Sequence, residues 1–544
     1  MEIKIVSSLD KVFPDIAPSL TIAKGSMLKN ERYHLQLCIY NDTEWAEREV
    51  KLEVTGSLAK YCRFRVVENI PAQVNEYVTK DDYYIFDEHT ARLYPDLLRP
   101  LEYGDVILPA KQWRSVWCTI HCPKGLPVGK HGLTFTATVP NGAVLTAPFT
   151  FEVIDAVLPK SDLLYTNWMH YDGIAQYYRV KPWSKKFYKL LGTYIDSAVS
   201  HGMNILYTPV FTPALDTKIG WERMDVQLVG LTEREENVYE FDFSELDKFI
   251  DFAQARGIEY FEMSHLATQW GATACPRIMA QTARGYQRIF GWDTDSFGDK
   301  YKTFLAQFLP ALDRYLKKKG IAKNTFFHIS DEPSEKQFAE YKKVADYIKG
   351  FIQDYKVMDA TSTTSNDIVE IPVLSTTHIP ENAADHVWAY YCCSACDNYL
   401  SNRFFNMPSQ RNRILGIQLY EQNRNGFLHW GFNFYNTAFS YRAVDPFAVS
   451  DAAGIFPAGD SYMVYAGTKG AWDSLRLEVF YDGLQDRMAL KLLEKYIGRE
   501  AVLELLHGEG VKGWKEYPRS AKWHVRFRER INKKIANLCS ETIV

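Results

Sequence analysis

Short segments in which apolar and polar residues alternate fill about the first 155 positions of the chain. Clear examples are YHLQLCIYND from Tyr33, WRSVWCTIHC from Trp113 and LTAPFTFEVID from Leu145. A period of two places the apolar side chains on one face of a β-strand, and closely spaced turns between such segments are typical of antiparallel sheets. The pattern predicts a β-sandwich over residues 1–158, and we interpret DAVLPKSD, residues 155–162, as the join to the next domain.

The pattern changes at Leu163, where helical and strand-like segments begin to alternate. Three predicted helices each end at a glycine, and each is followed by a short apolar segment. They cover residues 184–201, 244–256 and 299–319. Glycine is favoured at these ends because the residue after a helix often adopts the left-handed conformation. Repeated helix–strand units of this kind indicate a parallel sheet.

Eight apolar segments between Leu163 and Phe434 are predicted strands. They are DLLYTNWMH, MNILYTPV, IEYFEMS, TFFHIS, KVMDAT, IPVLSTT, VWAYY and GFLHWGFNF. Eight strands with helices between them favour a (β/α)8 barrel, which we place at residues 159–500, followed by a helical extension at 501–544 that packs on the barrel. A doubly wound open sheet is the alternative, but no glycine-rich nucleotide loop follows the first strand. The expected fold is multidomain, an antiparallel β-sandwich followed by an α/β barrel.

Length, charge and cysteine content restrict the function. The chain has 544 residues, too many for one ordinary core, and a net charge of −4 without a basic stripe, so we expect no nucleic-acid partner. The N-terminal MEIKIVSSLDKVFPD lacks a long apolar core, and no apolar run reaches the roughly 18 residues of a membrane span. We therefore expect a cytoplasmic protein, with secretion of a processed form left open. The nine cysteines include CCSAC from Cys392 but no matching pair at zinc-site spacing, so we expect reduced thiols, no metal and no cofactor.

Aromatic residues are abundant, with 13 Trp, 34 Tyr and 31 Phe. Such numbers fit a large core and a sandwich. They also fit aromatic platforms that stack against the C–H faces of sugar rings. The composition leaves both interpretations open.

Two adjacent carboxylates stand where the fourth predicted barrel strand ends, in FFHISDEPSEKQ, residues 326–337. Alternation along the strand turns His328 and Glu332 toward the barrel axis and Asp331 toward the helices. Pro333 cannot continue a strand ladder and disfavours a helical residue before it. The chain therefore turns there, and both acids reach one pocket at the barrel mouth. The alternative is an acid pair that only suits the dipole of the following helix.

The motif HISDEP, with a predicted helix after it, resembles the catalytic motif of glycoside hydrolase family 123, the retaining β-N-acetylgalactosaminidases. The segments GFLHWGFNFY and GDSYMVYAGTKGAWDSLRLEVFYDGLQDRMALKLL are similar to the C-terminal pattern of that family and its relatives. With the sandwich and the barrel, the resemblance covers nearly the whole chain. It implies a hydrolase that needs no cofactor and acts on terminal β-linked N-acetylgalactosamine of an oligosaccharide or glycolipid.

The resemblance also implies roles for the two acids. In substrate-assisted hydrolysis the 2-acetamido group of the sugar is the nucleophile. Glu332 then protonates the leaving oxygen, and Asp331 orients the acetamido N–H and stabilises its developing positive charge. Neighbouring carboxylates raise one pKa of the pair, which suits an acid that must keep its proton near neutral pH. An N-acetylglucosaminidase, another glycosidase of this fold and a non-catalytic glycan-binding protein are the alternatives.

The remaining predicted strand ends offer candidate sugar contacts. They are His170, Asp172, Glu262, His265, Trp270, Trp388, Tyr390, Tyr391, Trp430 and Asn433. The polar residues are candidates for binding sugar hydroxyls, and a tyrosine is a candidate donor to the acetamido carbonyl. Trp430 is the candidate for the floor of the pocket. The alternative for these residues is that they cap loops or pack in the core. Four charged residues of the last predicted barrel helix are interpreted as a structural ion network rather than substrate contacts. They are Arg476, Glu478, Asp482 and Asp486.

Overall fold

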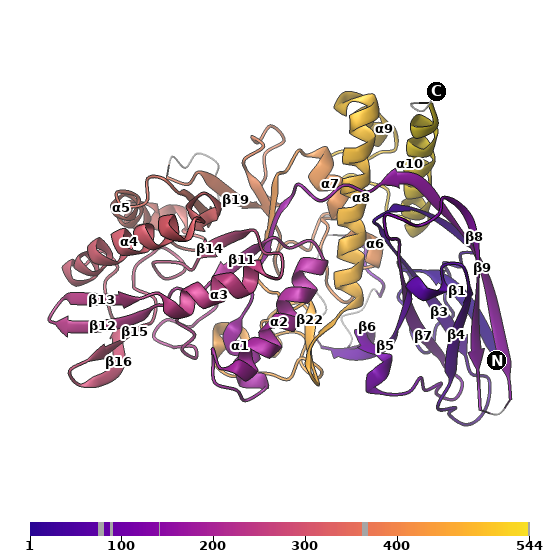
Figure 1. Cartoon of the computed structure of the whole chain (residues 1–544), viewed down its shortest axis with the longest axis horizontal. Helices are drawn as coiled ribbons and strands as arrows, with labels where there is room; N and C mark the ends of the chain where they lie inside the picture. Colours follow the sequence, from indigo (N-terminus) through magenta and orange to yellow (C-terminus); the bar gives the residue numbers. More distant parts are fainter. Residues whose placement is uncertain (74–80, 87–90, 141, 362–367, 542–544) are drawn as a thin grey trace.

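A two-sheet sandwich and a barrel lie on either side of one long helix, α8 (Leu475–Ile497) (Figure 1). This computed structural model describes residues 1–73, 81–86, 91–140, 142–361 and 368–541. Within those ranges no helix is both long and apolar enough to cross a membrane.

The sandwich consists of a five-stranded and a four-stranded sheet. The first has the order β1 (Glu2–Ser7), β3 (Arg32–Tyr40), β7 (Trp113–His121), β5 (Cys62–Ala72) and β6 (Arg92–Pro100). The second has the order β2 (Lys24–Lys29), β9 (Val144–Val157), β8 (Gly129–Thr138) and β4 (Lys51–Gly56). The strand pairs are antiparallel except β2 with β9, which is parallel. Apolar residues such as Leu35, Val116 and Phe151 meet between the sheets, as the period-two pattern predicts.

The eight predicted barrel strands are all present, and neighbouring strands run parallel. In sheet order they are β10 (Leu164–Asn167), β21 (Gly426–His429), β20 (Trp388–Tyr390), β19 (Ile371–Ser375), β18 (Lys356–Ala360), β17 (Thr325–Phe327), β14 (Tyr260–Met263) and β11 (Ile205–Thr208). Asn204 joins the two ends of this order, because its side chain accepts a hydrogen bond from the Tyr165 N–H (2.9 Å) and donates one to the Leu163 carbonyl (3.0 Å). The barrel prediction is confirmed.

Helices cover the barrel unevenly. Those after the first strands are α1 (Tyr171–Tyr177), α2 (Lys185–Ser200), α3 (Ser244–Gln254), α4 (Asp299–Lys319) and α5 (Phe338–Lys349), whereas α6 (Ser409–Arg413) and α7 (Leu415–Glu421) precede β21. Among the described residues no helix separates β18 from β19 or β19 from β20. Extra strands are inserted after β11, β14 and β21: β12 (Gly230–Glu235), β13 (Val238–Asp242), β15 (Ile278–Thr282), β16 (Gly285–Phe290), β22 (Val464–Gly467) and β23 (Gly470–Asp473).

Residue parity along the barrel strands separates two cores. Phe326 and Trp388 pack inside the barrel. Phe327, Ile329 and Phe427 pack outside it, in the core that includes residues of the surrounding helices. The alternation expected along FFHIS is therefore present, and it determines which side chains of β17 reach the barrel axis.

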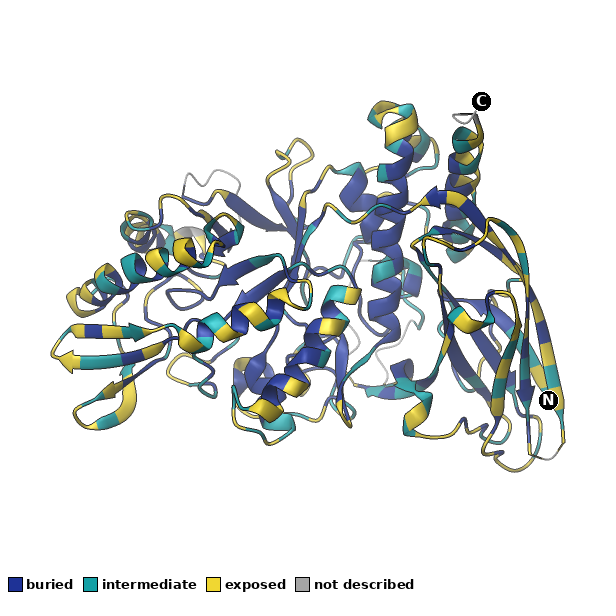
Figure 2. Ribbon diagram, in the orientation of Figure 1, coloured by how far each residue is buried: buried dark blue, intermediate teal, exposed yellow. Residues whose placement is uncertain are grey.

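The long helix α8 is buried along most of its length between the sandwich and the barrel (Figure 2). It leads into α9 (Arg499–Gly508) and α10 (Ala521–Glu541). Helix α10 contacts α8, and it also contacts the sandwich, where Glu529 accepts hydrogen bonds from the Ser26 N–H (2.9 Å) and hydroxyl (2.6 Å). The extension expected to pack on the barrel therefore packs on the sandwich as well. The domain limits at 158 and 500 stay predictions.

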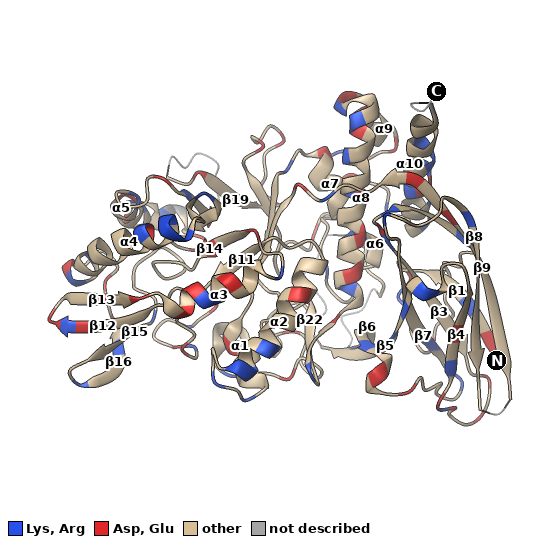
Figure 3. Cartoon of the chain, viewed as in Figure 1, with Lys and Arg blue, Asp and Glu red and all other residues tan. Residues whose placement is uncertain are grey.

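The charged residues of α8 form the structural network that the sequence suggested (Figure 3). Arg476 makes a bidentate ion pair with Asp96 of β6 (2.9 and 3.0 Å). Three acids of the helix also have cationic or histidine partners. The pairs are Glu478 with Arg65 and His34, Asp482 with His34, and Asp486 with Arg413 and Arg528. Most of these partners belong to the sandwich, so buried charge joins the two domains.

Candidate active site

A cavity of about 190 Å³ opens where the carboxyl ends of the barrel strands meet. Five residues predicted from the sequence line it: Trp270, Asp331, Glu332, Tyr390 and Trp430. The position is the one at which barrel enzymes carry their catalytic groups.

The backbone at Glu332 explains how two neighbouring acids enter one cavity. Glu332 has φ +45°, in the left-handed region that non-glycine residues seldom adopt. Its N–H donates to the Ala360 carbonyl (3.2 Å), and the Asp331 carbonyl accepts from the Trp270 N–H (2.8 Å), so the end of β18 and the loop after β14 hold the turn from both sides. Such strain persists where surrounding contacts over-determine the conformation, and it is concentrated at functional sites.

A buried histidine lies beneath the acid pair. One ring nitrogen of His328 lies 3.0 Å from Glu262 Oε2 and the other 3.3 Å from Asp359 Oδ1. Burial alone lowers the pKa of His328, but the hydrogen bonds and charges of Asp359 and Glu262 outweigh burial and raise that pKa to about 9. Asp359 also accepts from the Ile329 N–H (2.9 Å), so the imidazolium and its two carboxylates fix the segment that leads to the acid pair.

The two members of the acid pair have different environments. Asp331 is half-buried and Glu332 is exposed. Burial, and then the charge of Glu332, raise the pKa of Asp331 well above its usual range, while the His328 charge opposes them. Asp331 therefore holds its proton more tightly than an isolated carboxyl group does.

Tyr390, at the end of β20, donates a hydrogen bond from its hydroxyl to Glu332 Oε1 (2.6 Å). A short bond to a carboxylate is among the stronger hydrogen bonds in proteins. It fixes the direction of the Glu332 side chain.

Trp430 follows β21, and its ring position is fixed from behind. The indole N–H donates to Asp460 Oδ2 (3.0 Å). Burial raises the pKa of Asp460 to about 7, with the Arg403 charge opposing it. The ring therefore forms a fixed wall of the cavity, as expected for a surface that packs against a sugar.

A third carboxylate at the cavity, Asp216, was not predicted. It lies in the loop after β11, where it accepts a hydrogen bond from the Phe439 N–H (3.0 Å). Burial raises its pKa to about 6, with the Arg223 charge opposing. The other lining residues, none of them a predicted sugar contact, are Trp168, Leu215, Gln269, Ala360, Cys392, Cys393, Leu428 and Phe456. Ala360 and Leu428 belong to barrel strands and the others to loops, and no local pattern marked any of them as a sugar contact.

His170, Asp172 and Asn433 are not in the lining, and their expected role in holding sugar hydroxyls has to be revised. Asp172 is buried in a bidentate ion pair with Arg223 (2.6 and 2.9 Å), and Arg223 also lies 3.0 Å from His170 Nδ1. Asn433 accepts from the His170 N–H (2.8 Å) and donates to the His170 carbonyl (2.9 Å). The polar atoms of these residues already have protein partners. The residues therefore connect the loops behind the cavity and do not face a sugar in it.

Glu262 and His265 also lie behind the lining rather than in it. Glu262 accepts from Thr166 and faces His328. His265 stacks on His328, with ring centroids 4.4 Å apart, and burial followed by the His328 charge holds the pKa of His265 well below its usual range. His265, His328 and Asp359 bring three potential metal-ligand atoms within 4.8 Å. Both ring nitrogens of His328 already face carboxylates, those of Glu262 and Asp359. The positive charge of this cluster is therefore that of the protonated His328 ring.

The last two predicted residues are core residues. Trp388 is buried inside the barrel and packs edge-on against Phe326, with ring centroids 6.0 Å apart. Tyr391 points the other way, into the outer core beside Phe427. Their opposite directions follow strand parity, and neither reaches the cavity.

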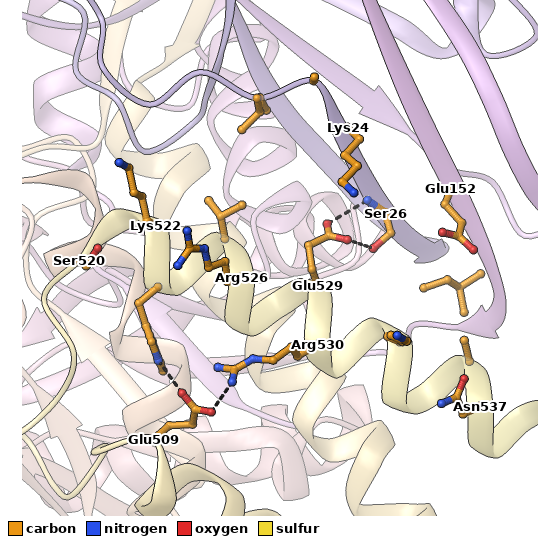
Figure 4. A pocket seen from close by; sticks show the side chains of 17 residues that line it. Lys24, Ser26, Glu152, Glu509, Ser520, Lys522, Arg526, Glu529, Arg530 and Asn537 are labelled. Carbon is orange, nitrogen blue, oxygen red and sulfur yellow. Dashed lines mark hydrogen bonds and ion pairs between the residues drawn. The ribbon is translucent and has the colours of Figure 1, made fainter.

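A larger cavity, about 1130 Å³, lies elsewhere (Figure 4). It lies beside α10, β2 and β9, and its lining includes Lys24 and Glu152 of the sandwich and Arg526 and Arg530 of the helix. Its acids at 509 and 529 are already bonded to neighbouring side chains, and it contains no adjacent acid pair. The volume of a cavity therefore does not show where catalytic groups lie. The smaller cavity of the barrel, which contains the acid pair, is the candidate active site.

Comparisons with known proteins identify the fold and the family of the chain. No curated protein matches the chain. Among solved structures, a family 123 glycoside hydrolase from Clostridium perfringens has a TM-score of 0.76 at 17% identity, covering 99% of this chain and 98% of that one, so the two share a fold. A β-D-glucuronidase from Dictyoglomus thermophilum (TM-score 0.32, 7% identity, 90% and 97% covered) and a xyloglucanase from Bacteroides ovatus (TM-score 0.27, 8% identity, 85% and 98% covered) are too distant to support any argument. Residues 168–493 match the profile described as "Glycoside hydrolase 123, catalytic domain". The chain therefore belongs to glycoside hydrolase family 123.

Proposed function

We propose that this chain is a retaining exo-glycosidase that removes terminal β-linked N-acetylgalactosamine from glycans or glycolipids, with the 2-acetamido group of the sugar as nucleophile. The observation that supports it is the entry of the adjacent Asp331 and Glu332 into one cavity through the left-handed turn at Glu332.

The adjacency favours an internal nucleophile. A retaining glycosidase with its own nucleophile holds two carboxyl groups roughly 5–5.5 Å apart on opposite sides of the scissile bond. Neighbouring residues at one strand end approach the sugar from one side. When the acetamido oxygen attacks the anomeric carbon, one acid protonates the leaving oxygen and the other holds the acetamido N–H, and both tasks lie on that side.

The position of a proton on the acid pair decides which acid does which task. The raised pKa belongs to Asp331, and Tyr390 donates a hydrogen bond to Glu332. An acetamido N–H that donates to Asp331 favours the charged form of Asp331 and moves the proton to Glu332. Glu332 then protonates the leaving oxygen, and Tyr390 stabilises the carboxylate that remains. Asp331 stabilises the positive charge that develops on the acetamido nitrogen.

The substrate class rests on the family and on its structural neighbour. The Clostridium perfringens enzyme acts in glycolipid glycan hydrolysis, which supports a glycan or glycolipid here. The choice of N-acetylgalactosamine over N-acetylglucosamine follows the family resemblance. A panel of aryl β-GalNAc, β-GlcNAc, α-GalNAc and β-Gal substrates tests it: cleavage of β-GalNAc is expected, and exclusive cleavage of β-GlcNAc contradicts the assignment. A protein that binds these sugars without cleaving any of them is a glycan-binding protein.

Asp216 provides the rival mechanism, because it is a third carboxylate on the same cavity. If Asp216 is the nucleophile, a covalent glycosyl ester forms on it, and the acetamido group is dispensable. We expect instead that the matching β-galactoside is essentially inert and that each fluorine on the acetyl methyl lowers the rate. Asp331→Asn is expected to lower activity strongly, and Asp216→Asn much less. A trapped ester found by peptide mass spectrometry refutes the acetamido nucleophile.

A further inference from the structure

An uninterrupted row of exposed aromatic rings extends from the rim of the candidate active site. Among the described residues seven aromatic side chains are exposed, and four of them form this row, which we call the aromatic strip: Trp221, Trp270, Phe439 and Tyr441. Their exposed fractions are 47%, 37%, 38% and 45%. Scattered exposed apolar residues are ordinary, but a contiguous patch marks a binding surface.

The rings of the strip contact one another in sequence. Trp270 meets Phe439 with centroids 6.2 Å apart, Phe439 meets Tyr441 at 6.3 Å, and Tyr441 meets Trp221 at 5.9 Å. Trp270 also lines the cavity. The strip is therefore continuous with the site that holds the acid pair.

Hydrogen bonds between the loops fix the strip in place. The loop of Asp216 bonds the loop of Phe439 three times: Asp216 Oδ2 accepts from the Phe439 N–H (3.0 Å), the Asp216 carbonyl accepts from Ser440 Oγ (2.7 Å), and the Lys218 N–H donates to the Phe439 carbonyl (3.2 Å). Gln269, next to Trp270, donates to the carbonyl of residue 217 (2.9 Å).

The backbone of the strip and of the loop that holds it is also strained. Trp270 and Phe439 of the strip and Asp216 of that loop have φ of +60°, +60° and +42°. Such conformations persist only where the surrounding structure enforces them. Rings held in position before binding lose little conformational entropy when a ligand arrives.

We propose that the aromatic strip binds the sugars on the leaving-group side of the scissile bond. This inference rests on the proposed exo-glycosidase function. An exo-acting enzyme holds only the terminal sugar in the cavity, so the next sugars of the same glycan pass over Trp270 and along the strip. Sugar rings present C–H faces to aromatic faces, and their hydroxyls stay in water at the exposed edges.

A glycan fits the strip better than a lipid bilayer. The first units of a glycolipid beyond the cavity are sugars, and the strip starts at the cavity edge. The Lys218 ammonium lies 5.5 Å from the Tyr441 ring centroid, which places a hydrated cation among the rings. Contact with a bilayer is the competing outcome of the experiment.

The experiment compares two distal-ring variants, Trp221→Ala and Tyr441→Ala, with the wild type. Trp270 is left unchanged because it also lines the cavity. Trp45→Ala, at an exposed tryptophan of the sandwich far from the strip in the sequence, is the control. Each protein is assayed with an aryl β-N-acetylgalactosaminide and with a soluble tetrasaccharide that ends in the same sugar. Calorimetric binding of the tetrasaccharide is measured in a Glu332→Gln background.

Each ring variant should weaken tetrasaccharide binding and lower kcat/KM for it about 2- to 10-fold, mainly through KM, as expected for one aromatic contact. Aryl-glycoside kinetics and the Trp45→Ala protein should match the wild type. Unchanged tetrasaccharide binding and kinetics overturn the proposal. A third substrate is the same glycan attached to a lipid in vesicles. If the ring variants hydrolyse only this substrate more slowly than the wild type does, the strip contacts the bilayer and the proposal is wrong. A wild type that cleaves no aryl glycoside refutes the glycosidase function, while the calorimetry still decides whether the strip binds glycan.

Discussion

Removing the Tyr390 hydroxyl tests how the acid is activated. Its hydrogen bond to Glu332 Oε1 is 2.6 Å long, and Tyr390→Phe deletes it without changing the ring. A hydrogen bond to a charged group contributes about 1.5–3 kcal/mol. If Tyr390 stabilises the carboxylate that Glu332 becomes after proton transfer, the variant should hydrolyse substrates with poor leaving groups about 10- to 100-fold more slowly.

The assay compares leaving groups at fixed pH. Rates are measured for a series of aryl β-N-acetylgalactosaminides of decreasing leaving-group acidity and for a natural oligosaccharide. The loss should grow as the leaving group becomes poorer, because only those substrates need the proton early. Tyr391→Phe is the matched control: its hydroxyl is buried, away from the cavity and without a hydrogen-bond partner among the described residues. The control should equal the wild type in activity and stability.

Two results refute this reasoning. Wild-type rates for Tyr390→Phe on the oligosaccharide remove Tyr390 from the proton transfer. An equal loss for every leaving group, with raised KM, assigns the hydroxyl to the acetamido group instead.

Three further predictions follow from the same geometry. Glu332→Gln should lower hydrolysis of natural glycans about 10²–10⁴-fold, the range of general acid catalysis, while calorimetry shows that sugar binding is kept; near-full activity contradicts the role. The pKa of His328 rises from 6.5 to about 9 on folding, so its contribution, roughly 3 kcal/mol, is complete below pH 6.5 and is lost as the pH rises toward 9; urea unfolding of the wild type should show that slope, and His328→Gln should remove it. Glu478→Gln should lower the free energy of unfolding by about 3–5 kcal/mol, because Arg65 and His34 lose their buried partner; an unchanged urea midpoint contradicts that network.

Local sequence determined the strands, their order and the turn at the acid pair. The period of two in FFHIS placed Phe327 outside the barrel and His328 inside because successive side chains of a strand point to opposite faces. The ladder of that strand ends at Phe327, so Pro333 lies past the strand end and does not cause it. The alternation rule acts within a few residues, so it is readable without the fold.

Tertiary structure alone decided which polar residues reach the cavity. His170 and Asp172 stand at a strand end as expected, yet Arg223, far along the chain, takes both as partners. Asp216 has no motif around it and reaches the cavity only because loops after β11 and β21 bond to each other. Sequence therefore determined the position and direction of the strand residues, through backbone geometry. Only the packed loops decided the partners of each charge, because a buried charge is paired with whatever side chain the fold brings to it.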